Sequence, residues 1–337
     1  MKFERLGRSG LTVSRICLGT MMFGGRTDEE TSARIIADAA ENGVNFIDTA
    51  DVYNDGASER IVGKAIAGNR DDWILATKAG NRMGNRPSHQ GLGRKWLLQA
   101  CTDSLKRLGT DYIDIYYLHL EDLATPLEET VLAVRSLMEA GKIRYFGVSN
   151  FRAWRIAEVS RLCDGYGMPR PVVCQPYYNA LNRMPEVEVL PACSHYGLGV
   201  VPYSPLARGV LTAKYDPDQP PPEESRAGAK DKRMMESEWR PESLEIARDI
   251  RDYAEAKGST PGAFALAWLL NNAAVTSVLA GPRTLDQWRA YLAGLDYPFA
   301  EDDEALVNDR VPSGHPSTPG YTDPQYPIEG RATRHGA

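Results

Sequence analysis

Two kinds of apolar pattern alternate along the chain. Short apolar runs rich in β-branched residues are separated by longer segments whose apolar residues recur every three or four positions. The short runs predict buried strands, and the longer segments predict helices that bury one face. The clearest helix covers residues 127–140, where Leu127, Val131 and Val134 share one stripe and Gly141 ends the pattern. An order of strand, helix, strand predicts a parallel sheet.

Eight strand–helix units follow one another from residue 16 onward. The predicted strands cover residues 16–20, 44–48, 73–78, 112–118, 144–149, 171–175, 199–204 and 275–280. Eight units predict a (β/α)₈ TIM barrel, and residues 3–13 before them predict an N-terminal β-hairpin. A doubly wound sheet is the alternative. It is disfavoured because the glycines of residues 19–25 do not have the G-x-G-x-x-G spacing after the first strand.

Two segments lack a clear period. Residues 208–241 contain Gly, Pro and charged residues and are interpreted as a long insertion, with a lid as the functional hypothesis. From about residue 300 the chain is rich in Pro, Gly and Ser and lacks a period, which predicts an irregular tail that is either draped over the body or partly disordered. The expected organisation is therefore one barrel domain over residues 1–337, with a C-terminal tail at about 300–337.

Composition narrows the classes of partner. The chain of 337 residues has a formal net charge of −6, which argues against general binding to nucleic acid or to an anionic membrane. The five cysteines are scattered, form no C-x-x-C, and so indicate a reducing compartment and no zinc site. No apolar run has the roughly 18 residues that a membrane span needs, and the N-terminus has no secretory pattern. We expect a cytoplasmic protein; the sequence does not indicate its oligomeric state.

Polar residues stand at the ends of three consecutive predicted strands. Asp48 and Tyr53 follow the second strand, Lys78 ends the third and His119 follows the fourth. In a barrel these ends surround one mouth. A buried unpaired carboxylate would cost several kcal/mol, so Asp48 requires a cation, and Lys78 is the candidate. Each residue alone also fits a structural role, but their adjacent placement favours a shared site.

The chemistry of these side chains suits a carbonyl group. A phenol has a pKa near 10 and a neighbouring ammonium lowers that pKa, so Tyr53 beside Lys78 would be a proton donor. A neutral imidazole can hydrogen-bond a carbonyl oxygen, and no metal is needed. No Ser–His or Cys–His pair supplies a nucleophile. A hydride from a nicotinamide would supply what is missing.

The later strand ends fit a groove for such a cofactor. Ser149, Asn150 and Gln175 could hold a carboxamide, and Tyr203 could stack on a flat ring. Two loops could meet a pyrophosphate through backbone N–H groups, an arginine or a helix N-terminus: Ser204, Pro205, Leu206, Ala207, Arg208 and Gly209, and then Gly281, Pro282, Arg283 and Thr284. Each of these segments alone also fits an ordinary turn.

Several ordered motifs over residues 1 to about 295 together resemble the aldo-keto reductase family. They are LGRSGLTVS at 6–14, LGTM at 18–21, FIDTA at 46–50 with Tyr53, ATK at 76–78, His119, GKIRYFGVSNF at 141–151, Gln175 and YSPL at 203–206. The LGTM segment is similar to the bacterial branch that includes potassium-channel β-subunits.

The resemblance implies a (β/α)₈ barrel that binds NADPH without a Rossmann fold. It implies Tyr53 as general acid, Lys78 and Asp48 as the pair that lowers its pKa, and His119 as the residue that orients the carbonyl. The implied cofactor contacts are Gly19, Thr20, Met21, Asp48, Ser149, Asn150, Gln175, Tyr203, Ser204, Pro205, Leu206, Arg208, Gly209, Gly281, Arg283 and Gln287. At the adenine end, Ala290 and Tyr291 stand where the family often has Glu and Asn.

The expected function is NADPH-dependent reduction of an aldehyde or ketone to the alcohol, with a small-molecule carbonyl compound as substrate and neither nucleic acid nor membrane as partner. Two alternatives remain. One is a Schiff-base barrel lyase with Lys78 as nucleophile, which a nearby Asp48 disfavours by holding the lysine charged. The other is a cofactor-binding regulatory subunit with the same fold.

Overall fold

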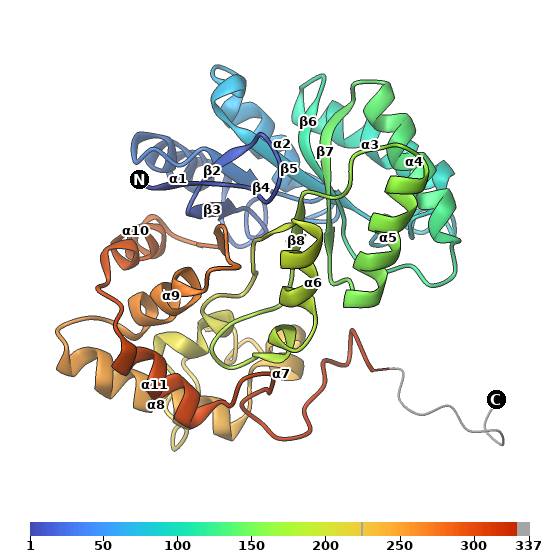
Figure 1. The fold of residues 1–337 in the computed structure, drawn as a ribbon. Helices are drawn as coiled ribbons and strands as arrows, with labels where there is room; N and C mark the ends of the chain where they lie inside the picture. Colours follow the sequence, from blue (N-terminus) through green and yellow to red (C-terminus); the bar gives the residue numbers. More distant parts are fainter. Residues whose placement is uncertain (224, 329–337) are drawn as a thin grey trace, which may run out of the picture.

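A closed ring of eight parallel strands forms the centre of the protein. The structure is a computed structural model that describes residues 1–223 and 225–328 (Figure 1). The sheet order is β10-β3-β4-β5-β6-β7-β8-β9, with strands β3 (Ile16–Gly19), β4 (Phe46–Asp48), β5 (Ile74–Ala79), β6 (Ile113–Leu118), β7 (Ile143–Ser149), β8 (Val173–Gln175), β9 (Gly199–Val200) and β10 (Val278–Ala280). A parallel bridge between Val200 and Val275 closes the ring. The predicted (β/α)₈ barrel is confirmed.

An antiparallel hairpin covers the N-terminal end of the barrel. Strands β1 (Phe3–Arg5) and β2 (Thr12–Ser14) pair, as predicted. The hairpin turn lies so close to the barrel that a Cβ on Gly7 would stand 2.5 Å from the backbone of Gly197 and Gly199. Leu6 and Val13 join the core cluster inside the ring. Because this end is covered, access to the barrel interior is from the C-terminal ends of the strands.

Helices surround the ring in chain order. They are α1 (Glu29–Glu41), α2 (Ala57–Ile66), α3 (Arg94–Leu108), α4 (Leu127–Glu139), α5 (Ala153–Gly165), α6 (Val189–Tyr196), α8 (Pro241–Ala256), α9 (Pro261–Asn271) and α10 (Leu285–Ala293). Along β6, Ile115 and Tyr117 belong to the inner core, whereas Tyr116 and Leu118 pack against the helices. This alternation has the period of two that a strand requires. No helix of the described residues is long and apolar enough to cross a membrane, and all five cysteines are buried and unpaired.

Three predicted elements differ in extent from the structure. The seventh strand was expected over residues 199–204 but ends at Val200, because Pro202 has no N–H to donate and Ser204 has a left-handed φ of 58°. The eighth begins at Val278, three residues later than expected. The helix expected at 186–196 is a 3₁₀ turn, η2 (Met184–Glu186), followed by α6, with Glu188 non-helical at φ −141° between them.

The expectation of an irregular tail from residue 300 is wrong for its first part. Helix α11 (Glu301–Arg310) lies beside α8 (Figure 1), held by ion pairs Lys257–Asp303 (2.8 Å) and Arg310–Asp249 (3.1 Å). The helix has no apolar stripe, and of its residues only Asp303 and Val307 are buried. Acidic residues in its first turn favour the helix instead. Residues 311–328 are irregular, and residues 329–337 of the predicted tail lie outside the described residues.

The insertion at 208–241 contains two short elements. A distorted 3₁₀ segment, η3 (Ala207–Thr212), follows β9, and a short helix, α7 (Lys232–Ser237), precedes α8. The other described residues between these elements, 213–223 and 225–231, are turns and irregular stretches, in keeping with the weak period. Its function as a lid stays a prediction.

Candidate active site

A cavity of about 710 Å³ opens at the C-terminal ends of the strands. Its lining includes Tyr53, His119 and all sixteen of the implied cofactor contacts, from Gly19 at the end of β3 to Gln287 on α10. Lys78 is the exception among the predicted site residues, because it lies buried behind Asp48. One cavity therefore brings together strand ends that are distant in sequence.

Asp48 and Lys78 form a buried ion pair at this mouth. The parallel register of β4 and β5 places Asp48 opposite Ala76, two residues before Lys78. Lys78 Nζ donates to Asp48 Oδ1, to Thr49 O (2.8 Å) and to Tyr53 Oη (3.3 Å). The second oxygen of Asp48 accepts from Gln175 Nε2 (3.0 Å). Both partners of the pair are fully buried. These hydrogen bonds offset the free energy that their removal from water costs.

The electrostatics of this group differ in one respect from the expectation. Burial acts to lower the pKa of Lys78, but Asp48 and Tyr53 outweigh it, so the pKa is raised and the ammonium persists at neutral pH. Burial raises the pKa of Tyr53, and Lys78 opposes this rise without reversing it. A net lowering of the Tyr53 pKa was expected. The protein without ligand does not show this lowering, because the cost of desolvating a phenolate outweighs its stabilisation by one ammonium. Tyr53 therefore holds its proton.

His119 stands beside Tyr53 at the edge of the cavity. Its ring is edge-on to the tyrosine ring, with centroids 6.0 Å apart. Burial, assisted by the charge of Lys78, holds the pKa of His119 well below its ordinary value. The imidazole is therefore neutral at pH 7. Within residues 1–223 and 225–328, its Nδ1 atom has no hydrogen-bond partner.

Amide and hydroxyl groups gather next to this corner. Asn150 donates to the carbonyl of His119 (3.0 Å) and accepts from the Tyr203 hydroxyl (2.8 Å). The Tyr203 ring also stacks on Tyr177, with centroids 5.6 Å apart. Asn150, Ser204 and Arg208 have left-handed φ values of 57°, 58° and 52°. Such conformations are strained in non-glycine residues and cluster at functional sites, so the backbone here is held by its surroundings.

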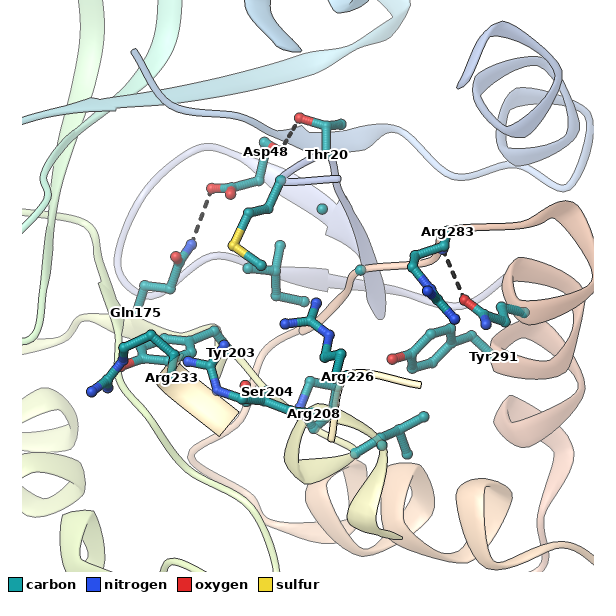
Figure 2. A pocket seen from close by; sticks show the side chains of 18 of the residues that line it. Thr20, Asp48, Gln175, Tyr203, Ser204, Arg208, Arg226, Arg233, Arg283 and Tyr291 are labelled. Atoms are coloured by element: carbon teal, nitrogen blue, oxygen red, sulfur yellow. Dashed lines mark hydrogen bonds between the residues drawn. The ribbon is translucent and has the colours of Figure 1, made fainter. Parts of the chain in front are cut away.

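The far end of the cavity is strongly basic. Predicted residues Arg208 and Arg283 line it together with Lys214 and Arg226, which sequence reasoning missed. Burial lowers the pKa of Arg226, and Arg208 lowers it further. Figure 2 shows Arg226 near the middle of the view, with Arg208 below it and Arg283 to its right. This excess of cations suits a ligand with several negative charges.

Other lining residues extend the cavity beyond the predictions. Ala290 and Tyr291 border it, and Figure 2 places Tyr291 beside Arg283. Gln325 and Tyr326 of the C-terminal segment also line it. Gln325, Tyr326 and Arg226 gave no sequence signal, because each stands in a segment without a period.

Similarity to known proteins agrees with this geometry. The chain belongs to the aldo/keto reductase family, whose model matches residues 15–309. It is 36% identical over 333 residues to an uncharacterized oxidoreductase, YrpG, of Bacillus subtilis (strain 168), covering 95% of this chain and 98% of the relative. It is 34% identical over 301 residues to a probable voltage-gated potassium channel subunit beta of Arabidopsis thaliana, covering 88% and 92%. It is 32% identical over 326 residues to the L-glyceraldehyde 3-phosphate reductase of Escherichia coli O157:H7, covering 93% of each chain.

Family membership and oxidoreductase relatives support a general function. The chain is an oxidoreductase of a family that acts on small-molecule carbonyl substrates.

Proposed function

We propose that the protein reduces an aldehyde or ketone to the alcohol with NADPH, using Tyr53 as general acid. The observation that carries this proposal is the hydrogen-bonded group of Tyr53, Lys78 and Asp48 at the mouth of a cavity whose other end is basic. A proton donor stands at one end of the cavity and an anion site at the other. An elongated dinucleotide phosphate fits both ends.

The chain's own residues would position the reactants. Ser149, Asn150 and Gln175 offer amide and hydroxyl groups where a nicotinamide carboxamide would bind, beside the Tyr203 ring. When bound, the reduced nicotinamide supplies a hydride to the carbonyl carbon. Tyr53 gives its proton to the carbonyl oxygen, which becomes the hydroxyl of the product. His119, being neutral, donates a hydrogen bond that holds this oxygen.

Lys78 and Asp48 would act through Tyr53. As the phenol loses its proton, the ammonium 3.3 Å away stabilises the phenolate. Asp48 keeps that ammonium charged and in place. The raised pKa of Tyr53 ensures that the acid is protonated before the reaction.

The cation count favours NADPH over NADH. Arg208, Lys214, Arg226 and Arg283 all line the basic end, more cations than a pyrophosphate alone would neutralise. The additional 2′-phosphate would use that surplus. The Escherichia coli relative is named for the reduction of an aldehyde, which supports the reaction class but does not identify the substrate here.

The two alternatives are weaker. Schiff-base chemistry at Lys78 requires a neutral, accessible amine, whereas this side chain is fully buried and donates to three acceptors. A regulatory subunit is suggested by the name of the Arabidopsis relative. The complete set of Asp48, Tyr53, Lys78 and His119 at the mouth argues for turnover instead.

The proposal is tested by NADPH consumption against a panel of aldehydes, dicarbonyls and ketones, repeated with NADH. Tyr53→Phe should lower turnover by about 10²–10⁴-fold, since it removes the general acid, while the Kd of NADPH measured by fluorescence stays near the wild-type value. Tyr112→Phe is the matched control, because its hydroxyl lies outside the cavity and donates to the exposed side chain of Asp71. Normal turnover by Tyr53→Phe would refute the assignment. Tight NADPH binding with no reduction of any carbonyl would favour the regulatory alternative.

A further inference from the structure

Residues 318–328, which we name the strap, run past the mouth of the cavity. Gln325 and Tyr326 line the same cavity as Tyr53 and His119. A turn built by Asp323 fixes their position: its carboxylate accepts from Gln325 N (2.9 Å) and its carbonyl accepts from Tyr326 N (3.0 Å). Asp323 therefore determines how Tyr326 is presented to the carbonyl end.

Arg233 on α7 holds Asp323 from the other side. Two parallel hydrogen bonds join their side chains, Nη1 to Oδ1 at 2.9 Å and Nη2 to Oδ2 at 2.6 Å. The side chains are only 24% and 10% exposed, so water screens this pair less than a surface pair. Figure 2 shows Arg233 on the side of the cavity that carries Tyr203 and Arg208.

Helix α7 is also connected to the basic end of the cavity. Asp231 caps its N-terminus by accepting from Met234 N (3.0 Å) and pairs with Arg226 at 3.8 Å. Arg208 donates to Ser237 Oγ on the same helix (3.2 Å). A continuous set of contacts therefore runs from the cations of the basic end, through α7, to Asp323 and Tyr326.

We propose that Arg233 is a positioning residue that couples the phosphate end of the cavity to the strap at its carbonyl end. This inference rests on the proposed function. Without an anion, Arg208, Lys214 and Arg226 repel one another in a partly buried place. A dinucleotide phosphate relieves that repulsion, stabilises the insertion, and through Arg233 and Asp323 fixes the strap. Carbonyl affinity then depends on bound dinucleotide, and the coupling is reciprocal.

Other contacts hold the two ends of the strap independently. Arg240 donates to Thr318 Oγ1 (2.9 Å) and to Ser317 Oγ (3.0 Å). Arg152 donates to the carbonyl of Pro327 (2.9 Å). Loss of the Arg233–Asp323 pair should therefore loosen the middle of the strap without releasing its ends, which makes the effect local and measurable.

Hydrogen–deuterium exchange of the full-length protein, with and without NADPH, tests the coupling. In wild type, NADPH should slow exchange of residues 318–328. Asp323→Asn and Arg233→Lys, which each lose the paired fork, should abolish that protection. Glu236→Gln is the control, because it removes the other carboxylate on Arg233 (3.1 Å) and leaves the strap contact intact.

Kinetics supply the second readout. Asp323→Asn should raise the KM of a reduced carbonyl by about five- to tenfold, with kcat and the Kd of NADPH within about twofold of wild type. No NADPH-dependent protection in wild type, or full protection in Asp323→Asn, would overturn the coupling. An increase in the Kd of NADPH as large as the increase in the carbonyl KM would also overturn it. If no carbonyl is reduced by wild type, the proposed reductase fails, and the exchange measurement still decides the coupling.

Discussion

The proposed catalytic corner (residues 45–53 with Lys78) and the cover (residues 208–223 and 225–241 with the strap) are built by different means. In the corner, side chains come from adjacent parallel strands, and backbone register sets their relative positions. In the cover, positions depend on side-chain ion pairs between segments that are distant in sequence, such as the pair of Arg233 and Asp323, which are 90 residues apart. A periodic pattern predicts the first kind of arrangement and contains no information about the second.

Within the corner, two carboxylates near the end of β4 are accommodated differently. Asp48 has Lys78 and Gln175 as partners. Asp51 is 1% exposed, and neither of its carboxylate oxygens has a hydrogen-bond partner in the part of the chain that the structure describes. Burial, followed by the negative charge of Glu59, raises its pKa to about 8. A buried carboxylate can thus find a cation or keep its proton, and sequence alone does not distinguish the two.

The largest expected effect comes from breaking the pair in the corner. Lys78→Met leaves Asp48 buried without its cation, which should lower the free energy of unfolding by about 3–5 kcal/mol. Turnover should fall by about 10²–10⁴-fold because the phenolate of Tyr53 loses its ammonium. Urea titration and NADPH consumption measure the two effects.

The double variant Asp48→Asn/Lys78→Met separates stability from chemistry. Removing both charges should restore much of the stability, because no unpaired ion stays buried, while turnover remains low. A double variant that recovers turnover would show that the corner acts only through folding.

The same contrast explains what could be predicted. Eight apolar runs and the polar residues at their ends defined the barrel and placed Asp48, Tyr53, Lys78 and His119 at one mouth. Arg226, Lys214 and Tyr326 were missed because single cations or aromatics in Pro- and Gly-rich segments have no period. Helix α11 was missed because an acidic first turn and an ion pair to α8, not an apolar stripe, hold it.

The second effect concerns Asp51. Its folded-state pKa of about 8 lies above the ordinary value of about 3.9, so between about pH 4 and pH 8 the folded protein binds the proton and the unfolded chain does not. Stability attributable to Asp51 therefore falls as pH rises through this window. Asp51→Asn removes that dependence and should stabilise the protein by a few kcal/mol near pH 8.

Thermal unfolding from pH 5 to pH 9 measures this difference. The advantage of Asp51→Asn should grow with pH and be small near pH 5. Asp55→Asn, on the same loop but exposed to solvent, is the control and should keep the wild-type profile. A constant difference across the range would show that the amide acts by packing or hydrogen bonding and not by removing a titration.

The smallest effect sharpens the contrast from the side of the cover. Arg226→Gln removes one cation from the basic end but keeps a polar side chain. Since a hydrogen bond to a charged group contributes about 1.5–3 kcal/mol, the Kd of NADPH should rise roughly tenfold or more. The salt dependence of binding should decrease as well, because one charge contact is lost. Arg251→Gln, which removes an exposed pair with Asp252, should leave both quantities unchanged. A cofactor Kd that is insensitive to Arg226 would mean that the corner binds the dinucleotide without the cover, and that the cover serves the carbonyl alone.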